Sequence, residues 1–319
     1  MPVSVSVPVP ARTVSVVIPV FNAAGSLPDL VDRLHAALDP ICEAHEVILV
    51  NDASRDASRT VMDSLLPGRP WLRTFDLARN SGQHAALLCG IRAAQHDVIV
   101  TLDDDLQHPP EEVPKLLSRL DEGFDVVFGT PEDERHNLWR KVASRVTKAA
   151  LSQAIGGENA RHVSAFRAFR TKVREAFDGY RSPFVSIDVL LTWGTDRFSA
   201  VPVRHEPRRH GASNYTFRSL IRHAMNMMTG FSTFPLQVAS VVGFSLALFG
   251  VGVLAWVFGR YLVEGGSVPG FPFLASIVAI FSGAQLFAIG VIGEYLARMH
   301  FRMMEKPAYT VREERTGGG

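Results

Sequence analysis

Three consecutive carboxylates stand where an apolar run ends. Asp103, Asp104 and Asp105 directly follow the apolar residues 98–102. In an extended chain, Asp103 and Asp105 point to one side and Asp104 points to the other. Two carboxylates on one side repel each other unless a cation lies between them, and hard divalent cations such as Mg²⁺ or Mn²⁺ prefer oxygen ligands. The pattern predicts a metal site at Asp103 and Asp105, to which Gln107 adds a side-chain oxygen.

The acidic triplet also has a simpler interpretation, which the pattern alone leaves open. Glu111 and Glu112 follow shortly after it, and acidic residues are favoured in the first turn of a helix, so the triplet could serve only as a cap. A second acidic residue, Asp52, follows another apolar run, 46–50, and alone it is equally compatible with an Asx turn. Together, the two acidic clusters suggest a nucleotide beside a metal.

Apolar runs that suit strands alternate with helical patterns through residue 129. The strand-like runs are 14–20, 46–50, 72–77 and 98–102, and the helical patterns between them are 27–38, 57–66 and 83–94. The runs are apolar at nearly every position, as strands covered on both faces of a parallel sheet must be. The sequence therefore predicts a doubly wound α/β sheet. Ligands of such sheets collect at the carboxyl ends of the strands, where both acidic clusters stand.

The two common glycine-rich motifs that bind phosphate are absent before the apolar C-terminal segments. Neither Gly-x-Gly-x-x-Gly nor Gly-x-x-x-x-Gly-Lys-Ser/Thr occurs before residue 231, so a metal and arginines must neutralise phosphates in place of a glycine cradle.

The charges of the chain nearly balance. Lys and Arg number 33 against 32 Asp and Glu, a net charge of +1. No general field draws the protein to nucleic acid, and we expect no nucleic-acid partner.

Two long segments near the C-terminus carry no charged residue and no histidine. They are 231–259 and 265–293, each of 29 residues. About 20 helical residues span the hydrocarbon core of a bilayer, so each run is long enough to cross it. Two buried helices of a soluble protein are the alternative, but such helices normally keep a polar face. The sequence predicts a transmembrane hairpin over 231–298, with helices at about 233–260 and 271–296.

Basic residues flank this hairpin on one side of the membrane. They are Arg218, Arg222 and His223 before it and Arg298, Arg302 and Lys306 after it. The positive-inside rule then predicts a multi-pass membrane protein whose large N-terminal part and both termini lie in the cytoplasm. The preceding segment, 215–230, mixes apolar and basic residues and is expected to form an interfacial amphipathic helix. An ordinary juxtamembrane linker is the alternative.

The remaining segments carry no chemistry in this interpretation. Residues 1–12 lack the features of a secretory signal and are expected to form a flexible tail, and 299–319 are expected to form a cytoplasmic tail that ends in three glycines. Between the first tail and the membrane segments, the domain that carries the acidic clusters spans 13–214 and is expected to be cytoplasmic. Cys42 and Cys89 have no companion ligands at metal spacing, so both are interpreted as reduced structural residues.

Four motifs in order resemble those of a known family. They are Pro19-Val20-Phe21-Asn22, Asn51-Asp52-Ala53-Ser54, Arg79-Asn80-Ser81-Gly82-Gln83-His84-Ala85-Ala86 and Asp103-Asp104-Asp105-Leu106-Gln107-His108-Pro109-Pro110. This set is similar to that of membrane-anchored polyprenyl-phosphate glycosyltransferases, inverting enzymes of glycosyltransferase family 2. The resemblance covers roughly residues 15–312. It implies a GT-A fold, a nucleotide-sugar donor, a polyprenyl-phosphate acceptor and Mg²⁺ or Mn²⁺ as cofactor, and it allows a homo-oligomer such as a tetramer.

The resemblance also implies roles for individual residues. Asp103, Asp105 and Gln107 would hold the metal, and Asp103, Asp105, Arg167 and Arg208 would be catalytic. The nucleotide-sugar would be surrounded by Pro19, Phe21, Asn22, Asp52, Arg79, Asp104 and Arg135. The acceptor phosphate would be bound by Arg167, Arg208, Ser213 and Asn214. Arginine suits phosphate because its guanidinium forms two parallel hydrogen bonds.

The chain departs from the family pattern at several positions. Ala23 replaces an acidic residue, Ala53 a glycine and Asn214 a frequent lysine, and Ser164 and Ala165 stand where several relatives carry an acidic residue. A universal aspartate base is therefore not expected. The chemistry does not require one, because a phosphomonoester with a second pKa of about 6 is already mostly anionic at pH 7. A single in-line displacement would invert the anomeric centre.

Two other functions remain open from the sequence. A processive polysaccharide synthase is disfavoured because the chain lacks Gln-x-x-Arg-Trp and has only two candidate spans. A non-catalytic membrane scaffold that binds nucleotide or lipid is disfavoured by the intact acidic triplet. The sugar and the nucleobase have no readable code in the sequence.

Overall fold

The protein was analysed as a computed structural model that describes residues 12–131, 163–182, 184–206, 234–264 and 270–318. It divides into two compact units. The first comprises Met1–Leu220 together with Glu305–Gly319, and the second comprises Ile221–Met304.

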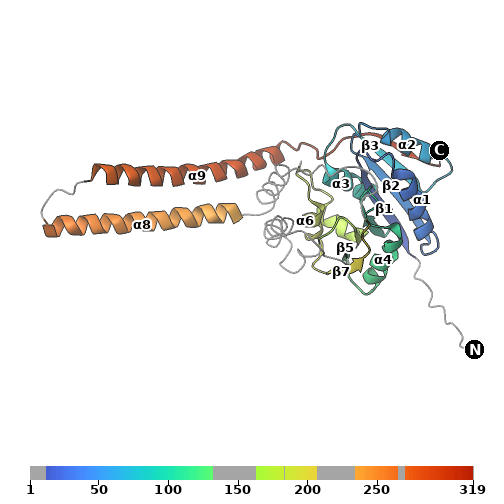
Figure 1. The fold of residues 1–319 in the computed structure, drawn as a ribbon, viewed down its shortest axis with the longest axis horizontal. Coiled ribbons are helices and arrows are strands. Elements are labelled where there is room, and N and C mark those ends of the chain that lie inside the picture. The colour runs from blue at the N-terminus through green and yellow to red at the C-terminus, as the bar shows by residue number, and fades with distance from the viewer. Residues whose placement is uncertain (1–11, 132–162, 183, 207–233, 265–269, 319) are drawn as a thin grey trace, which may run out of the picture. The chain divides into compact units, whose positions relative to one another are not determined.

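A mixed eight-stranded sheet forms the centre of the first unit (Figure 1). Its order is β7-β5-β6-β4-β1-β2-β3-β8. Most neighbours pair in parallel, while β6 and β8 run antiparallel to the strands beside them. The strands are β1 (Thr13–Val20), β2 (Ala44–Asn51), β3 (Leu72–Leu77), β4 (Val98–Thr101), β5 (Val126–Pro131), β6 (Arg167–Arg170), β7 (Phe198–Val203) and β8 (Val311–Thr316). The predicted doubly wound, mostly parallel α/β sheet is confirmed.

Helices cover both faces of the sheet because neighbouring residues of each strand point to opposite sides. Val16 and Ile18 of β1 belong to the same buried cluster as Leu30 and Leu34 of α1. On the other face α3 lies so close that a Cβ on its Gly90 would fall 2.3 Å from Val17 Cγ1. Among the described residues of this unit, the helices are α1 (Leu27–Leu38), α2 (Ser58–Leu65), α3 (Gln83–Ala93), η1 (Pro110–Glu112), α4 (Val113–Asp121), η3 (Thr171–Phe177) and α6 (Ile187–Leu191).

The C-terminal segment is more ordered than the tail expected from the sequence. Strand β8 pairs antiparallel with β3 and closes that edge of the sheet. Beyond it the Gly317 N–H donates to Leu72 O at 3.0 Å. A Cβ on Gly317 would lie 2.1 Å from Arg69 O and 2.5 Å from Leu66 O, so only glycine fits there. The chain returns to the eight-stranded sheet after the second long apolar helix.

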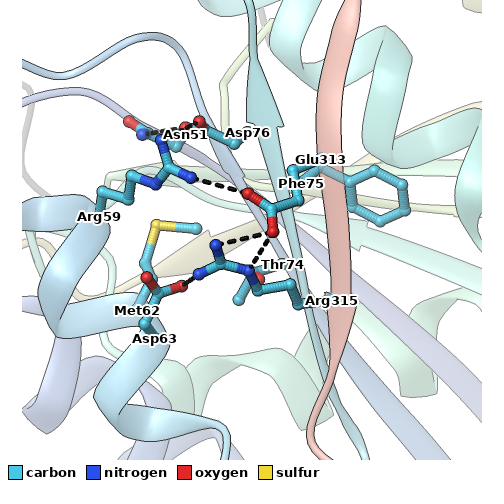
Figure 2. Close-up of a pocket in the computed structure, with 9 residues that line it drawn as sticks. All are labelled: Asn51, Arg59, Met62, Asp63, Thr74, Phe75, Asp76, Glu313 and Arg315. Carbon is cyan, nitrogen blue, oxygen red and sulfur yellow. Dashed lines mark hydrogen bonds and ion pairs between the residues drawn. The ribbon is translucent and has the colours of Figure 1, made fainter.

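Charged side chains fasten β8 to the sheet around a pocket between α2, β3 and β8 (Figure 2). Arg59 pairs with Asp76 at 3.1 Å and with Glu313 at 2.7 Å. Arg315 pairs with Glu313 at 2.7 Å and also with Asp63. The charged groups that line this pocket pair with one another, so we interpret these ion pairs as structural contacts that hold β8 in the sheet.

The second unit is a pair of long apolar helices, α8 (Phe234–Glu264) and α9 (Phe271–Met303). Each contains a segment long and apolar enough to cross a membrane, Pro235–Arg260 with a mean hydropathy of 2.3 and Ile280–His300 with 1.4. An apolar stretch of 18 residues in each segment has no buried share, whereas the core helix of a soluble protein would be mostly buried. The helices approach each other where a Cβ on Gly250 would lie 2.7 Å from Phe281 Cζ.

Candidate active site

The acidic triplet forms a loop at the carboxyl edge of the sheet. Strand β4 ends at Thr101, and Asp103 and Asp105 follow outside it. Asp103 Oδ1 accepts a hydrogen bond of 2.6 Å from Gln83 Nε2 at the start of α3. Asp105 Oδ1 accepts one of 3.1 Å from the Gln107 backbone N–H. The loop therefore carries all three residues predicted to hold a metal, Asp103, Asp105 and Gln107.

Asp104 has a different surrounding from its two neighbours. Its Oδ2 accepts a hydrogen bond of 3.0 Å from the Phe21 N–H, and its backbone carbonyl accepts one of 2.6 Å from Ser26 Oγ. Burial, followed by the charges of Asp103 and Asp105, raises the pKa of Asp104 to about 7, against the lowering effect of the Phe21 N–H. Asp104 thus joins the acidic loop 103–107 to the end of β1, and the clustered negative charge favours a cation beside it.

Asp52, at the end of β2, shapes the neighbouring loop. Its two carboxylate oxygens accept hydrogen bonds from the Ser81 N–H at 2.6 Å and the Gly82 N–H at 2.8 Å. Burial raises the pKa of Asp52 even though both N–H groups favour the charged form. The next residue, Ala53, has φ 54, in the left-handed region that favours glycine. The glycine of the family motif therefore matches the backbone conformation found here.

The other predicted nucleotide residues that the structure describes are Phe21, Asn22, Arg79 and Pro19, and all but Pro19 lie in loops at this edge. Phe21 exposes 41% of its surface just after β1, and Arg79 is exposed after β3. Asn22 Oδ1 accepts a 2.8 Å hydrogen bond from the Arg55 N–H, which ties the loops after β1 and β2 together. Pro19, by contrast, is buried within β1. It positions the loop from inside the sheet.

Arg167 has an unexpected partner. It opens β6, in register with Thr101 of β4, and is only 2% exposed. Its guanidinium forms an ion pair with Asp188 of α6, while its Nε has no hydrogen-bond partner. Next to Asp188, the Ile187 N–H donates to His84 Nδ1 of α3 at 3.3 Å. The sequence predicts a phosphate contact for Arg167, and in the structure its side chain lies in a buried ion pair with Asp188.

Residues 204–206, which precede the region of Arg208, contact the acidic loop 103–107. The Glu206 N–H donates to Gln107 O at 2.8 Å. Arg204 Nε pairs at 2.7 Å with Glu112, whose side chain is 2% exposed and also binds Lys115. Burial tends to raise the pKa of Glu112, but the hydrogen bonds from Lys115 and Arg204 outweigh it and lower that pKa. These contacts hold residues 204–206 beside the loop of Asp105.

His108 is a site residue to which the sequence assigned no role. Its ring lies 5.2 Å from that of Phe166 and 5.1 Å from that of His205. Burial, followed by the neighbouring His205, lowers the pKa of His108 to about 4, against the charge of Asp105. The imidazole is therefore neutral at pH 7 and lies beside the acidic loop 103–107 without adding charge. Its place in Asp105-Leu106-Gln107-His108 was the available signal.

Several predicted residues lie outside the described part of the chain. They are Arg135, Arg208, Ser213 and Asn214, and so is the segment 215–230 predicted to form an interfacial helix. Within the described part, two carboxylates and an amide stand on one loop, and these oxygen-bearing side chains are of the kind that binds Mg²⁺ or Mn²⁺.

A family model decides the classification. Residues 15–177 match "Glycosyl transferase family 2". The chain belongs to this family. Its relatives also cover nearly the whole chain. The undecaprenyl-phosphate 4-deoxy-4-formamido-L-arabinose transferase of Pseudomonas syringae pv. syringae is 34% identical over 308 residues, 95% of this chain and 91% of that protein. The protein of the same name from Salmonella paratyphi A is 33% identical over 307 residues, 95% of this chain and 94% of that protein.

A solved structure agrees with the fold of this family 2 glycosyltransferase. Glucosyl-3-phosphoglycerate synthase from Mycobacterium tuberculosis, in complex with Mn²⁺, UDP and glucosyl-3-phosphoglycerate, matches with a TM-score of 0.51 and 18% identity. The match covers 68% of this chain and 78% of that protein. The GT-A fold class expected from the motifs is confirmed, together with the two apolar helices that follow the catalytic sheet.

Proposed function

We propose that this glycosyltransferase transfers a sugar from a nucleotide-sugar to undecaprenyl or another polyprenyl phosphate at the cytoplasmic face of the inner membrane. The main observation behind this proposal is that one chain combines the acidic loop 103–107, at the carboxyl edge of a GT-A sheet, with two helices long and apolar enough to cross a membrane. The names of the relatives support undecaprenyl phosphate as the acceptor. Basic residues at both ends of the hairpin support the cytoplasmic orientation.

We assign the described residues two tasks in this reaction, holding the metal and binding the nucleotide. Asp103, Asp105 and Gln107 would hold Mg²⁺ or Mn²⁺, and the Mn²⁺ of the structural neighbour supports a divalent ion. When bound, the ion stabilises the negative charge that develops on the departing nucleoside diphosphate. Phe21 and Asn22 would border the nucleotide, and Asp52 would fix the loop after β3 against it.

The acceptor needs positioning more than activation. A polyprenyl phosphate is mostly dianionic at pH 7, so its oxygen can attack the anomeric carbon without a protein base. Attack opposite the leaving diphosphate forms the new sugar–oxygen bond as the old one breaks, which inverts the configuration. The difficulty is the repulsion between two anionic phosphates, and cationic groups reduce it. We propose Arg208, Ser213 and Asn214 for the acceptor phosphate and Arg135 for the donor, while Arg167 supports α6 through Asp188.

Transfer of radiolabel from a panel of UDP-, GDP- and dTDP-sugars into organic-extractable lipid tests the proposal. The assay uses purified full-length protein, undecaprenyl phosphate, and either Mg²⁺, Mn²⁺ or EDTA. We expect one donor to label the lipid and EDTA to abolish the labelling. Asp105→Asn should lower turnover at least about 100-fold, as expected when charge stabilisation in the transition state is lost, whereas the exposed Asp196→Asn should not. Lack of lipid labelling with every donor, while nucleotide still binds, would favour a binding scaffold.

A further inference from the structure

A second group of metal-ligating side chains lies away from the catalytic edge. His35 and Asp39 are at the C-terminal end of α1, and His45 is the second residue of β2. One ligand atom of each residue lies within 4.8 Å of those of the other two. From this juxtaposition we propose that His35, Asp39 and His45 form a binding site for a transition metal ion of the Zn²⁺ type.

The two imidazoles have the separation that one metal ion requires. His35 Nδ1 and His45 Nε2 are 3.0 Å apart. Zinc–nitrogen bonds of about 2.0–2.1 Å in a tetrahedron place two ligand nitrogens about 3.3 Å apart. An ion would therefore enter with a shift of a few tenths of an ångström. Without metal, the same pair forms a single hydrogen bond between the rings.

The local fold directs the three ligands toward one point. Asp39 follows His35 by four residues, which places both on one face of α1, and the Asp39 N–H donates to His35 O at 2.9 Å. Trp71 stacks on His35 with ring centroids 4.5 Å apart and an angle of 11°. The Trp71 carbonyl also accepts the Val47 N–H at 2.8 Å, just beyond His45. The stacked indole thus restricts the His35 ring and lies beside the start of β2.

The ligand set distinguishes this site from the catalytic one. Two nitrogens and one carboxylate oxygen suit Zn²⁺, Co²⁺ or Ni²⁺, whereas the oxygen-rich loop of Asp103 and Asp105 suits Mg²⁺ or Mn²⁺. His45 precedes the end of β2 at Asn51 by six residues, or about 20 Å along an extended strand. The proposed ion would therefore cross-link α1 to β2 and stabilise the fold without touching the substrates.

Calorimetric titration of Zn²⁺ into full-length, tag-free protein tests the proposal. EDTA first removes bound metal, and after its removal an excess of Mg²⁺ is kept present to occupy the catalytic loop. We expect one Zn²⁺ per chain. His35→Gln and His45→Gln should each weaken binding by at least about tenfold, the lower limit for disturbing even a supporting residue of a metal site. The matched control His96→Gln changes a histidine close to His45 that is not a ligand and should bind Zn²⁺ as the wild type does.

Thermal unfolding supplies an independent measurement. Because a ligand of the folded state raises its stability, Zn²⁺ should raise the midpoint for the wild type and for His96→Gln, and should not for His35→Gln. Equal Zn²⁺ affinity in His35→Gln and the wild type would overturn the proposal, as would a wild type that binds no Zn²⁺. If a histidine variant fails to fold, Co²⁺ binding by the wild type decides, since it should give the intense visible absorption of a tetrahedral site that Zn²⁺ then removes. A Co²⁺ spectrum like that of the aqueous ion would overturn the proposal.

Discussion

Breaking the ion pair between Arg167 and Asp188 should strongly destabilise the catalytic unit. Arg167 is 2% exposed and the side chain of Asp188 11% exposed, so Asp188→Asn leaves a guanidinium without a counter-charge in a nearly water-free place. Removing one partner of a buried pair costs about 3–5 kcal/mol. At about 2–4 °C per kcal/mol for a domain of this size, the unfolding midpoint should fall by roughly 6–20 °C.

A double variant separates the charge from the packing. In Arg167→Met/Asp188→Val both charges are absent, and replacing a buried pair with apolar residues is often close to neutral. We expect the double variant to regain most of the stability lost in Asp188→Asn. Arg170→Met is the control, because Arg170 follows on the same strand in a more exposed pair with Asp125 at 3.7 Å, which should contribute no more than about 1 kcal/mol.

Thermal unfolding in detergent and the lipid-labelling assay give the two readouts. If Asp188→Asn is as stable as the wild type, the argument from the buried charge is wrong. If the double variant is stable but loses lipid labelling, Arg167 contacts a phosphate during the reaction, as its motif suggests. Retained turnover in a stable double variant would support a positioning role for Arg167.

Two further predictions follow from a buried carboxylate and from a glycine. Because the pKa of Glu112 is lowered in the fold, its contribution to stability is present above its unfolded pKa of about 4.5 and is lost as the pH falls through the folded value. Thermal unfolding from pH 7 to pH 3 should therefore show a smaller loss of stability in Glu112→Gln than in the wild type, and parallel curves would contradict the assignment. Gly317→Ala should cost about 1–3 kcal/mol, because its Cβ would meet a carbonyl oxygen at 2.1 Å. Limited proteolysis should release its C-terminus faster than in Gly318→Ala, where the nearest atom is 3.7 Å away, and equal rates would contradict the docking of β8.

The sequence predicted the centre of the sheet because that part carries an unambiguous hydrophobic pattern. Strands β1, β2 and β4 contain apolar runs that are buried on both faces, and acidic residues follow shortly after β2 and β4. Strand β8 has no such pattern. Val311–Thr316 is mostly charged, since an edge strand covered by ion pairs needs no apolar face. Only the tertiary fold, through Arg59 and Arg73, explains its pairing.

The sequence also could not show which side chains far apart in the chain pair with one another. Asp188 follows Arg167 by 21 residues, and no motif connects them; only the packing of α6 beside β6 does. His35 and His45 are separated by the turn from α1 to β2, so their rings meet only once both elements pack on the same sheet. Residue types revealed the candidate ligands, but the elements that aim them had to be known before the pairs could be recognised.

The carboxylates at the catalytic edge differ in what they can bind, although the family motifs treat them together. Asp52 and Asp104 accept hydrogen bonds from backbone N–H groups of other loops, and these bonds fix the loops after β1 and β3. Asp103 and Asp105 instead bind groups of α3 and of their own loop, beside Gln107. A carboxylate that already bonds the backbone of another loop can leave for a metal only if that loop shifts. We therefore propose Asp103 and Asp105 as the metal ligands, with Asp52 and Asp104 holding the loops after β1 and β3 in place.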